Sequence, residues 1–147
     1  MRKRRITIVD DDPSVLNMLK MFFELKDYEV IACSKPIRCS VCDGDQQCDN
    51  RRPCGDMLIT DYRMPGMTGI ELLQAQSRMG CRVPAKNKAL ISGNLDDKAL
   101  EVVKELGCSY FSKPFTFNDL EVWLQQCEER MDLNQPLGLK RWELRAA

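Results

Sequence analysis

The segment ITIVDDDPSVLNML, residues 6–19, decides the fold prediction for this chain. Its first four residues are all β-branched and present apolar groups on both faces, which is typical of a buried strand in a parallel sheet. Asp12 and Pro13 are suited to the N-cap and the first position of a helix. The apolar residues that follow share one helical stripe: Val15, Leu16, Leu19, Phe22 and Phe23. A buried strand followed directly by an amphipathic helix predicts one βα unit.

The same alternation continues along the chain. Four more strands are predicted, over residues 28–32, 57–60, 89–92 and 109–112. Three more helices are predicted, over residues 70–79, over residues 95–106, and from Thr116, which has capping-box spacing with Asp119. Alternating strands and helices predict an α/β fold, a doubly wound five-stranded parallel sheet with helices on both faces.

Length and composition narrow the class of protein. With 147 residues, the chain is long enough for one domain. Its 22 basic and 22 acidic residues balance, which argues against a nucleic-acid or membrane partner. The chain has no apolar run long enough for a membrane span or a signal peptide, so a cytoplasmic location is predicted. In that reducing compartment, eight cysteines favour thiols or metal ligands over a disulfide framework.

Polar side chains follow four of the five predicted strands. Asp10 and Asp11 follow the first strand, Asp61 the third, Ser92 ends the fourth, and Lys113 follows the fifth. The carboxyl ends of parallel strands meet at one crevice, so these groups are expected to converge. Three neighbouring carboxylates repel one another, and Mg²⁺ is the cation that such an oxygen site suits. A metal, a lysine and a hydroxyl together are suited to phosphoryl transfer.

Four motifs carry a resemblance to a known family: IVDDDPS (8–14), LITDYRMPGMTG (58–69), ALISGN (89–94) and YFSKPF (110–115). From about Ile6 to Glu129 the chain resembles the receiver domain of two-component response regulators, the CheY-like group. The resemblance implies a flavodoxin-like fold with strand order 2-1-3-4-5. It implies a receiver over residues 1–130. The remaining residues, 131–147, are expected to form a tail that is too short for a DNA-binding output domain, so no output domain is expected. Two interpretations of the tail stay open, a surface extension or a partner-binding helix.

The resemblance also implies roles for the polar residues. Asp61 would accept a phosphoryl group from a sensor histidine kinase or a phosphotransfer protein. Magnesium would be held by Asp10, Asp11, Asp61 and the backbone carbonyl of Arg63. Lys113 would bind a phosphoryl oxygen, and its bond to Pro114 is expected to be cis. The domain would act as a signalling module rather than an enzyme, with self-catalysed phosphorylation and dephosphorylation as its only chemistry.

The resemblance also implies that two residues change position when Asp61 is phosphorylated. Ser92 would move onto the phosphoryl group, and Tyr110 would turn inward with it, although an aromatic in a short strand can also serve only in packing. A downstream protein would read the face formed by the helix over 95–106, the strand over 109–112 and the last helix. The chain would be a monomer or a weak phosphorylation-dependent dimer. A hydrolase is a poorer alternative, because the chain has no histidine.

The segment between the second and third strands, residues 33–56, shows no helical stripe and is rich in cysteine. We expect a cysteine-rich loop that replaces or distorts the second helix of the fold. Its spacing C-x2-C-x5-C-x5-C could supply four thiolates to structural zinc or an iron–sulfur cluster: Cys39, Cys42, Cys48 and Cys54. Disulfides, a thiol switch and unligated cysteines in a loop stay open as alternatives. A rival function follows, a metal- or redox-sensing module on a receiver scaffold.

Overall fold

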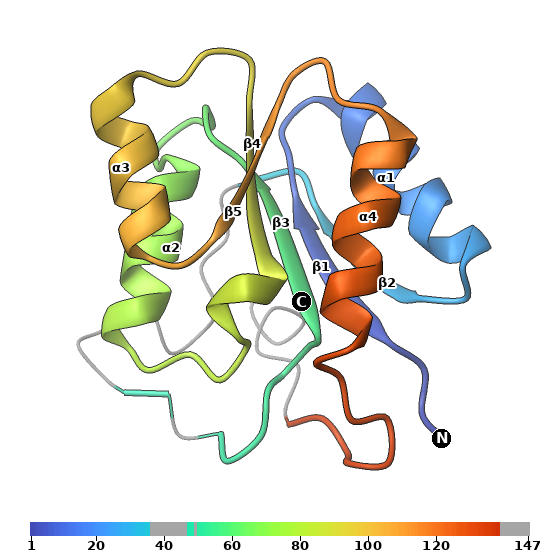
Figure 1. Cartoon of the computed structure of the whole chain (residues 1–147). Helices are drawn as coiled ribbons and strands as arrows, with labels where there is room; N and C mark the ends of the chain where they lie inside the picture. The colour runs from blue at the N-terminus through green and yellow to red at the C-terminus, as the bar shows by residue number, and fades with distance from the viewer. Residues whose placement is uncertain (36–46, 49, 139–147) are drawn as a thin grey trace.

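In the described part of the chain, five parallel strands form one sheet in the order β2-β1-β3-β4-β5 (Figure 1). The computed structural model describes residues 1–35, 47–48 and 50–138. The strands are β1 (Arg5–Val9), β2 (Glu29–Cys33), β3 (Met57–Asp61), β4 (Lys88–Ser92) and β5 (Ser109–Ser112). The predicted fold class and strand order are confirmed, and every predicted strand boundary lies within one residue of the observed one.

Local capping sets where the helices begin. The helices are α1 (Pro13–Leu25), α2 (Gly69–Arg78), α3 (Asp97–Glu105) and α4 (Phe117–Glu128), with a short 3-10 helix η1 (Ala85–Asn87) before β4. The predicted capping box between Thr116 and Asp119 is present at the start of α4. α3 begins two residues later than predicted, because the side chain of Asp96 accepts the backbone N–H of Ala99 and so makes Asp96 the N-cap.

The helices cover the two faces of the sheet in pairs, α1 with α4 and α2 with α3 (Figure 1). Side chains along each strand alternate between these two layers. One core lies under α1 and α4 and includes Ile6, Ile8, Ile59, Leu19, Phe23, Leu120 and Trp123. The other lies under α2 and α3 and includes Val9, Leu58, Leu90, Leu72, Leu73 and Val103. Because both faces are buried, the strand interiors are mainly apolar, with Thr7 and Thr60 as buried polar exceptions, and the charged groups lie at the strand ends.

The segment after α4 returns to the amino ends of the strands. Residues 131–138 pack there as irregular chain, where the backbone N–H of Arg2 donates to the carbonyl of Leu133 at 3.2 Å. The backbone N–H of Gly138 donates to the carbonyl of Pro53 at 2.8 Å. The first part of the tail is therefore a surface-packed extension, one of the two interpretations that the sequence left open. Residues 139–147 lie outside the described residues.

The connection from β2 to β3 is described only in part. Residues 34–35, 47–48 and 50–56 contain no helix. The predicted replacement of the second helix falls mainly on residues outside the description, and so do Cys39 and Cys42. None of the helices in the described ranges has the length and apolar character that a membrane crossing needs.

Candidate functional site

Three aspartates meet at the carboxyl end of the sheet. Asp10 directly follows β1, Asp11 comes next, and Asp61 is the last residue of β3, the neighbour of β1. One carboxylate oxygen of each lies within 4.8 Å of the others. Asp10 and Asp61 are buried, whereas Asp11 is exposed. The convergence predicted from the strand ends is therefore present.

Asp10 is held so that only one of its two carboxylate oxygens is satisfied. Its Oδ1 accepts the backbone N–H of Asp12 at 2.9 Å, at the turn into α1. Its Oδ2 is buried and has no hydrogen-bond partner among the described residues, since Lys113 Nζ is 3.9 Å away. Burial, above all, raises the pKa of Asp10 to about 6, and the nearby Asp61 charge adds to the rise.

Asp61, at the end of β3, forms an ion pair with Lys113, which follows β5; β4 lies between these two strands. The Nζ of Lys113 donates to Asp61 Oδ1 at 3.1 Å. Lys113 reaches this position because it follows β5 and its backbone N–H donates to the carbonyl of Ser92 at 2.9 Å. Its bond to Pro114 is cis, as predicted. Burial raises the pKa of Asp61, although the Lys113 ammonium works in the opposite direction.

Ser92 and Tyr110 are joined through one backbone carbonyl. The hydroxyl of Ser92 donates to the carbonyl of Asn94 at 3.2 Å and accepts the Asn94 N–H at 3.3 Å. The Ser92 carbonyl accepts the Tyr110 hydroxyl at 3.3 Å, besides the Lys113 N–H. Tyr110 is half-buried and packs on the core under α2 and α3. A displacement of Ser92 would therefore disturb its hydrogen bonds to Tyr110, in β5, and to Lys113, which follows β5.

Gly69 is a structural requirement of this site that the sequence analysis missed. It is the first residue of α2, and a Cβ added there would lie 2.2 Å from the backbone oxygen of Asp61 and 2.6 Å from a methyl group of Leu90. Only glycine allows α2 to begin this close to the end of β3. The sequence signal was the glycine at the end of LITDYRMPGMTG, but no spacing rule gives that distance.

The arrangement fits a hard divalent cation. Three carboxylates beside one ammonium leave a local excess of negative charge. A buried oxygen of Asp10 has no hydrogen-bond partner among the described residues, and a bound cation would satisfy it. Oxygen donors of this type are those that Mg²⁺ takes in proteins. Arg63 is exposed and lines a shallow depression with Asp11, and its carbonyl stays a predicted ligand.

The cysteine cluster cannot be assembled from the described residues. Cys48 and Cys54 are both partly exposed, and Cys54 packs at the edge of the core under α2 and α3. Cys33 is buried at the end of β2, and burial raises its pKa to about 11, which disfavours the thiolate that binds metal. Within the described ranges, the three aspartates are the group with metal-binding spacing. The zinc or iron–sulfur site stays a prediction.

Comparison with known families assigns the chain to a family. The family description "Response regulator receiver domain" matches residues 6–125 of the chain. The chain belongs to this family. Receiver domains are signalling domains of two-component systems, so the receiver identified from sequence motifs is confirmed.

Two curated relatives have names that agree with this family. The response regulator protein TodT of Pseudomonas putida is 33% identical over 116 residues, which are 78% of this receiver chain and 47% of that protein. The transcriptional regulatory protein FlgR of Helicobacter pylori is 30% identical over 113 residues, 76% of this chain and 26% of that protein. The receiver chain therefore spans less than half the length of either relative.

Solved receivers share the fold. The CheY-like receiver domain protein from Methanospirillum hungatei matches with a TM-score of 0.64 and 24% identity, over 88% of this chain and 97% of that one. The non-phosphorylated HemR receiver domain from Leptospira biflexa matches with a TM-score of 0.67 and 20% identity, over 91% and 98% of the two chains. At these identities the likeness concerns the fold alone.

Proposed function

We propose that this receiver accepts a phosphoryl group on Asp61, from a histidine kinase or a phosphotransfer protein, and passes the signal on through the face formed by α3, β5 and α4. The observation that carries the proposal is the acidic crevice with its lysine. Three carboxylates lie within 4.8 Å of one another, and Lys113 Nζ lies 3.1 Å from Asp61. We take residues 1–130 as the receiver and residues 131–147 as a tail.

The reaction needs little covalent chemistry from the protein. An Asp61 carboxylate oxygen attacks the phosphorus atom, the bond from phosphorus to the donor nitrogen breaks, and an acyl phosphate forms on Asp61. Mg²⁺, when bound, neutralises charge on the phosphoryl oxygens. Asp10, Asp11 and Asp61 would hold it, together with the carbonyl of Arg63. The buried Oδ2 of Asp10, without a hydrogen-bond partner among the described residues, supports this ligand set.

Lys113 and Ser92 are suited to bind the transferred group. The Lys113 ammonium already donates to Asp61, so it can donate to a phosphoryl oxygen attached there. The Ser92 hydroxyl makes two long contacts with Asn94, at 3.2 and 3.3 Å, which a charged phosphoryl acceptor can replace. Tyr110 is bonded to the carbonyl of Ser92, so movement of Ser92 would alter β5 in the output face.

Phosphorylation of Asp61 is tested by intact-protein mass spectrometry after incubation with acetyl phosphate and Mg²⁺. Wild type should gain the mass of one phosphoryl group, and Asp61→Asn should gain none. Asp97→Asn is the matched control, because Asp97 is an exposed aspartate in the first turn of α3. Asp10→Asn should be phosphorylated far more slowly, and chelation of Mg²⁺ should slow wild type to the same degree. Phosphorylation of Asp61→Asn, or none of wild type, contradicts the proposal.

A further inference from the structure

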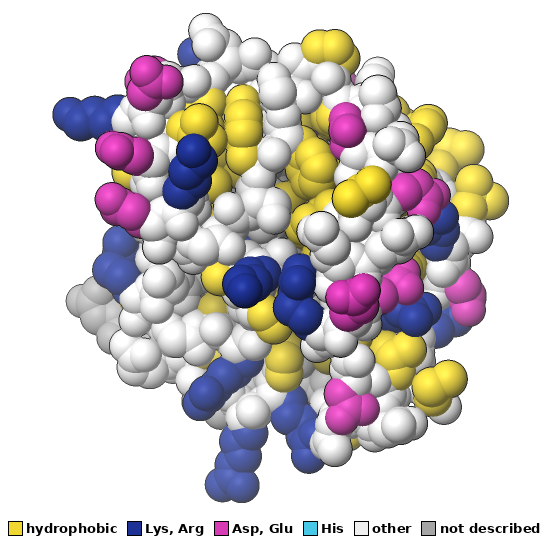
Figure 2. Space-filling model, in the orientation of Figure 1, with side chains coloured by type: hydrophobic (Ala, Val, Ile, Leu, Met, Phe, Trp, Pro, Cys, Tyr) yellow, Lys and Arg dark blue, Asp and Glu magenta, His cyan; other side chains and the backbone are white. Residues whose placement is uncertain are grey.

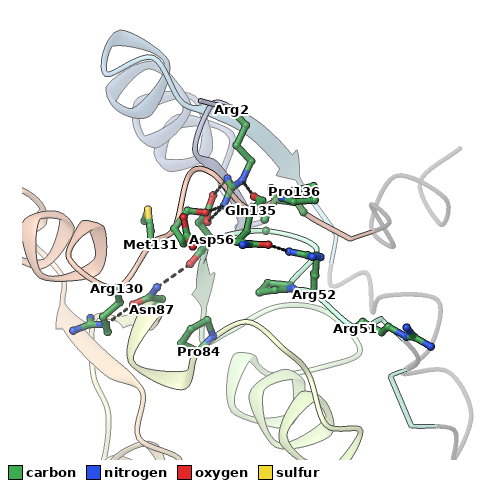
Figure 3. A pocket seen from close by; sticks show the side chains of 14 residues that line it. Arg2, Arg51, Arg52, Asp56, Pro84, Asn87, Arg130, Met131, Gln135 and Pro136 are labelled. Carbon is green, nitrogen blue, oxygen red and sulfur yellow. Dashed lines mark hydrogen bonds and ion pairs between the residues drawn. The ribbon is translucent and has the colours of Figure 1, made fainter.

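A pocket lies at the opposite end of the sheet from the aspartates, where the strands begin (Figure 3). Asp56 directly precedes β3 and Asn87 directly precedes β4, and both line it. Residues from the end of α4 and from the docked part of the tail complete its wall. Its volume is about 250 Å³. We call it the arginine pocket, because four arginines line it: Arg2, Arg51, Arg52 and Arg130.

The acidic group on its floor is fully satisfied within the fold. The two oxygens of Asp56 accept from Nη1 and Nη2 of Arg2 at 2.7 and 2.8 Å. The backbone N–H of Arg5 donates a third bond to the same carboxylate at 2.8 Å. Arg2 and Asp56 therefore cancel each other's charge, and this pair neither attracts nor repels a ligand strongly.

Arg52 and Arg130 flank the pocket on opposite sides and remain available (Figure 3). Both side chains are exposed, and neither pairs with a carboxylate in the described part of the chain. Arg52 donates from Nη1 to the side-chain oxygen of Gln135. Arg130 donates from Nε to Asn87 Oδ1 at 2.7 Å, which fixes its position while leaving its Nη1 without a described acceptor. Two oriented guanidinium groups thus keep unused N–H donors.

Net charge at this end favours an anion. The described lining residues include four arginines and two aspartates, the second being Asp132 at the exposed rim, so positive charge is in excess among them. Lys and Arg side chains also gather at the lower end of the face in Figure 2, the end where the strands of Figure 1 begin. The chain as a whole has a formal net charge of zero, so this excess is a local feature.

Size and shape restrict the kind of anion. The pocket is smaller than the roughly 300–1,000 Å³ that is usual for drug-sized ligands. Among the described residues, its apolar wall consists largely of prolines and includes no aromatic ring to stack on a base: Pro53, Pro84 and Pro136. Guanidinium groups match the geometry of phosphate oxygens and can bind them in a bidentate way. We propose that the arginine pocket binds a small anion with adjacent phosphate groups, held between Arg52 and Arg130.

Inorganic pyrophosphate is the probe that tests this site, with the full chain in a buffer that contains EDTA. EDTA removes divalent cations, so pyrophosphate is not drawn to the aspartates through a metal. Backbone amide NMR shifts should saturate with added pyrophosphate and concentrate in residues 51–56, 85–87 and 130–138. Equal ionic strength from sodium chloride should not reproduce them. Binding should weaken steeply as salt is added, because the attracting charges are exposed.

Variants separate this site from general attraction to a basic surface. In Arg52→Gln/Arg130→Gln, the dissociation constant for pyrophosphate should rise by about tenfold or more, since two charge-assisted contacts are lost. Lys98→Gln removes an exposed cation at the start of α3 and should leave the constant unchanged. The proposal is overturned if wild-type shifts do not saturate, if they spread over the whole surface, or if the double variant binds as wild type does. The wild-type shift map decides the matter even if the double variant does not fold.

Discussion

Asp10 and Asp56 are both buried aspartates next to a central strand, yet they lie at opposite ends of the sheet. Asp10 follows β1 and is 1% exposed, and Asp56 precedes β3 and is 6% exposed. Asp56 has a bidentate arginine and a backbone N–H as partners. Asp10 has one backbone N–H, a lysine 3.9 Å away, and a buried oxygen without a hydrogen-bond partner in the described structure.

The difference separates a carboxylate whose charge is neutralised within the fold from one whose charge is poorly compensated. At the amino end, charge is neutralised within the fold, and the ion pair ties the N-terminal segment to the start of β3. At the carboxyl end, carboxylates are held together at a cost in folding free energy, which a bound cation can offset. Four substitution or pH experiments test this contrast. The first concerns the close approach of Gly69 to the backbone oxygen of Asp61 at the carboxyl end.

Gly69→Ala should have the largest effect on stability. The added Cβ would lie 2.2 Å from the backbone oxygen of Asp61, and neither the end of β3 nor the start of α2 can withdraw without breaking core contacts. We expect the free energy of unfolding to fall by about 3 kcal/mol or more, at the upper end for overpacked cores. Urea unfolding measures it, and the rate of phosphorylation by acetyl phosphate should fall as well.

Gly93→Ala is the control for this prediction. Gly93 follows β4, and the nearest atom to its added Cβ is 4.0 Å away, on Lys113. Its unfolding midpoint should stay close to that of wild type. Equal loss of stability in both variants would mean that glycine content, and not the contact with Asp61, determines the effect.

Asp56→Asn and Asp10→Asn should change stability in opposite directions. Asp56→Asn leaves the half-buried Arg2 without its main counter-charge. Breaking a fully buried pair costs about 3–5 kcal/mol, and the partial exposure of Arg2 lowers the expected loss to about 2 kcal/mol. Asp10→Asn removes a buried charge that has poor compensation, so in EDTA at neutral pH it should stabilise by about 1–2 kcal/mol. Denaturant unfolding of the two isosteric variants measures both changes. A loss of stability of similar size in both variants would show that both carboxylates stabilise the fold and would contradict the contrast.

The strand ends explain why the acidic crevice could be predicted from sequence and the arginine pocket could not. Asp10, Asp11 and Asp61 each follow an apolar strand, and parallel strands bring their carboxyl ends together. Arg2 and Asp56 are 54 residues apart in the sequence, and no local sequence pattern predicts that they form an ion pair. The pocket that they share draws on the N-terminal segment, the loop before β3, the end of α4 and the tail, so only the folded chain brings these residues together.

The cysteine segment marks another limit of the sequence. Its spacing predicts a metal site, but Cys39 and Cys42 lie outside the described residues, so their distances from Cys48 and Cys54 are unknown. By contrast, the predicted strand over 109–112 has the observed boundaries, because a short apolar segment flanked by turn-forming residues predicts both ends of a strand. Pattern rules work where a segment is regular and buried, and residues 33–56 offer no such regularity.

Stability in the absence of Mg²⁺ should fall as pH rises from about 4 to above 6. The pKa of Asp10 is about 6 in the folded state and close to 3.8 in the unfolded chain, so the folded state binds more protons between these values. Its contribution is therefore greatest at low pH and is lost as the carboxyl ionises. Each pKa unit corresponds to about 1.4 kcal/mol, which sets the loss at no more than about 3 kcal/mol.

Urea unfolding of wild type and Asp10→Asn at pH 4.5 and pH 7.5, in EDTA, isolates this contribution. The chain has no histidine, so few other groups titrate in the upper part of that range. The difference in stability between variant and wild type should grow toward pH 7.5, and saturating Mg²⁺ should reduce it by stabilising wild type alone. A difference that is constant with pH contradicts the assignment of the raised pKa to Asp10.

Gly138→Ala should have the smallest effect, although its predicted clash resembles that of Gly69. A Cβ at Gly138 would lie 2.7 Å from the backbone oxygen of Arg52. Residues 132–138 are held at the surface by hydrogen bonds and belong to neither hydrophobic core, so this segment can move away. We expect a loss of less than about 1 kcal/mol, within the range of surface substitutions. Faster hydrogen exchange of the backbone amide at position 138 should accompany it, because the bond from this amide to the Pro53 carbonyl is broken. A loss as large as that of Gly69→Ala would mean that the tail is part of the cooperative fold, and the amino end of the sheet would then be as tightly constrained as the carboxyl end.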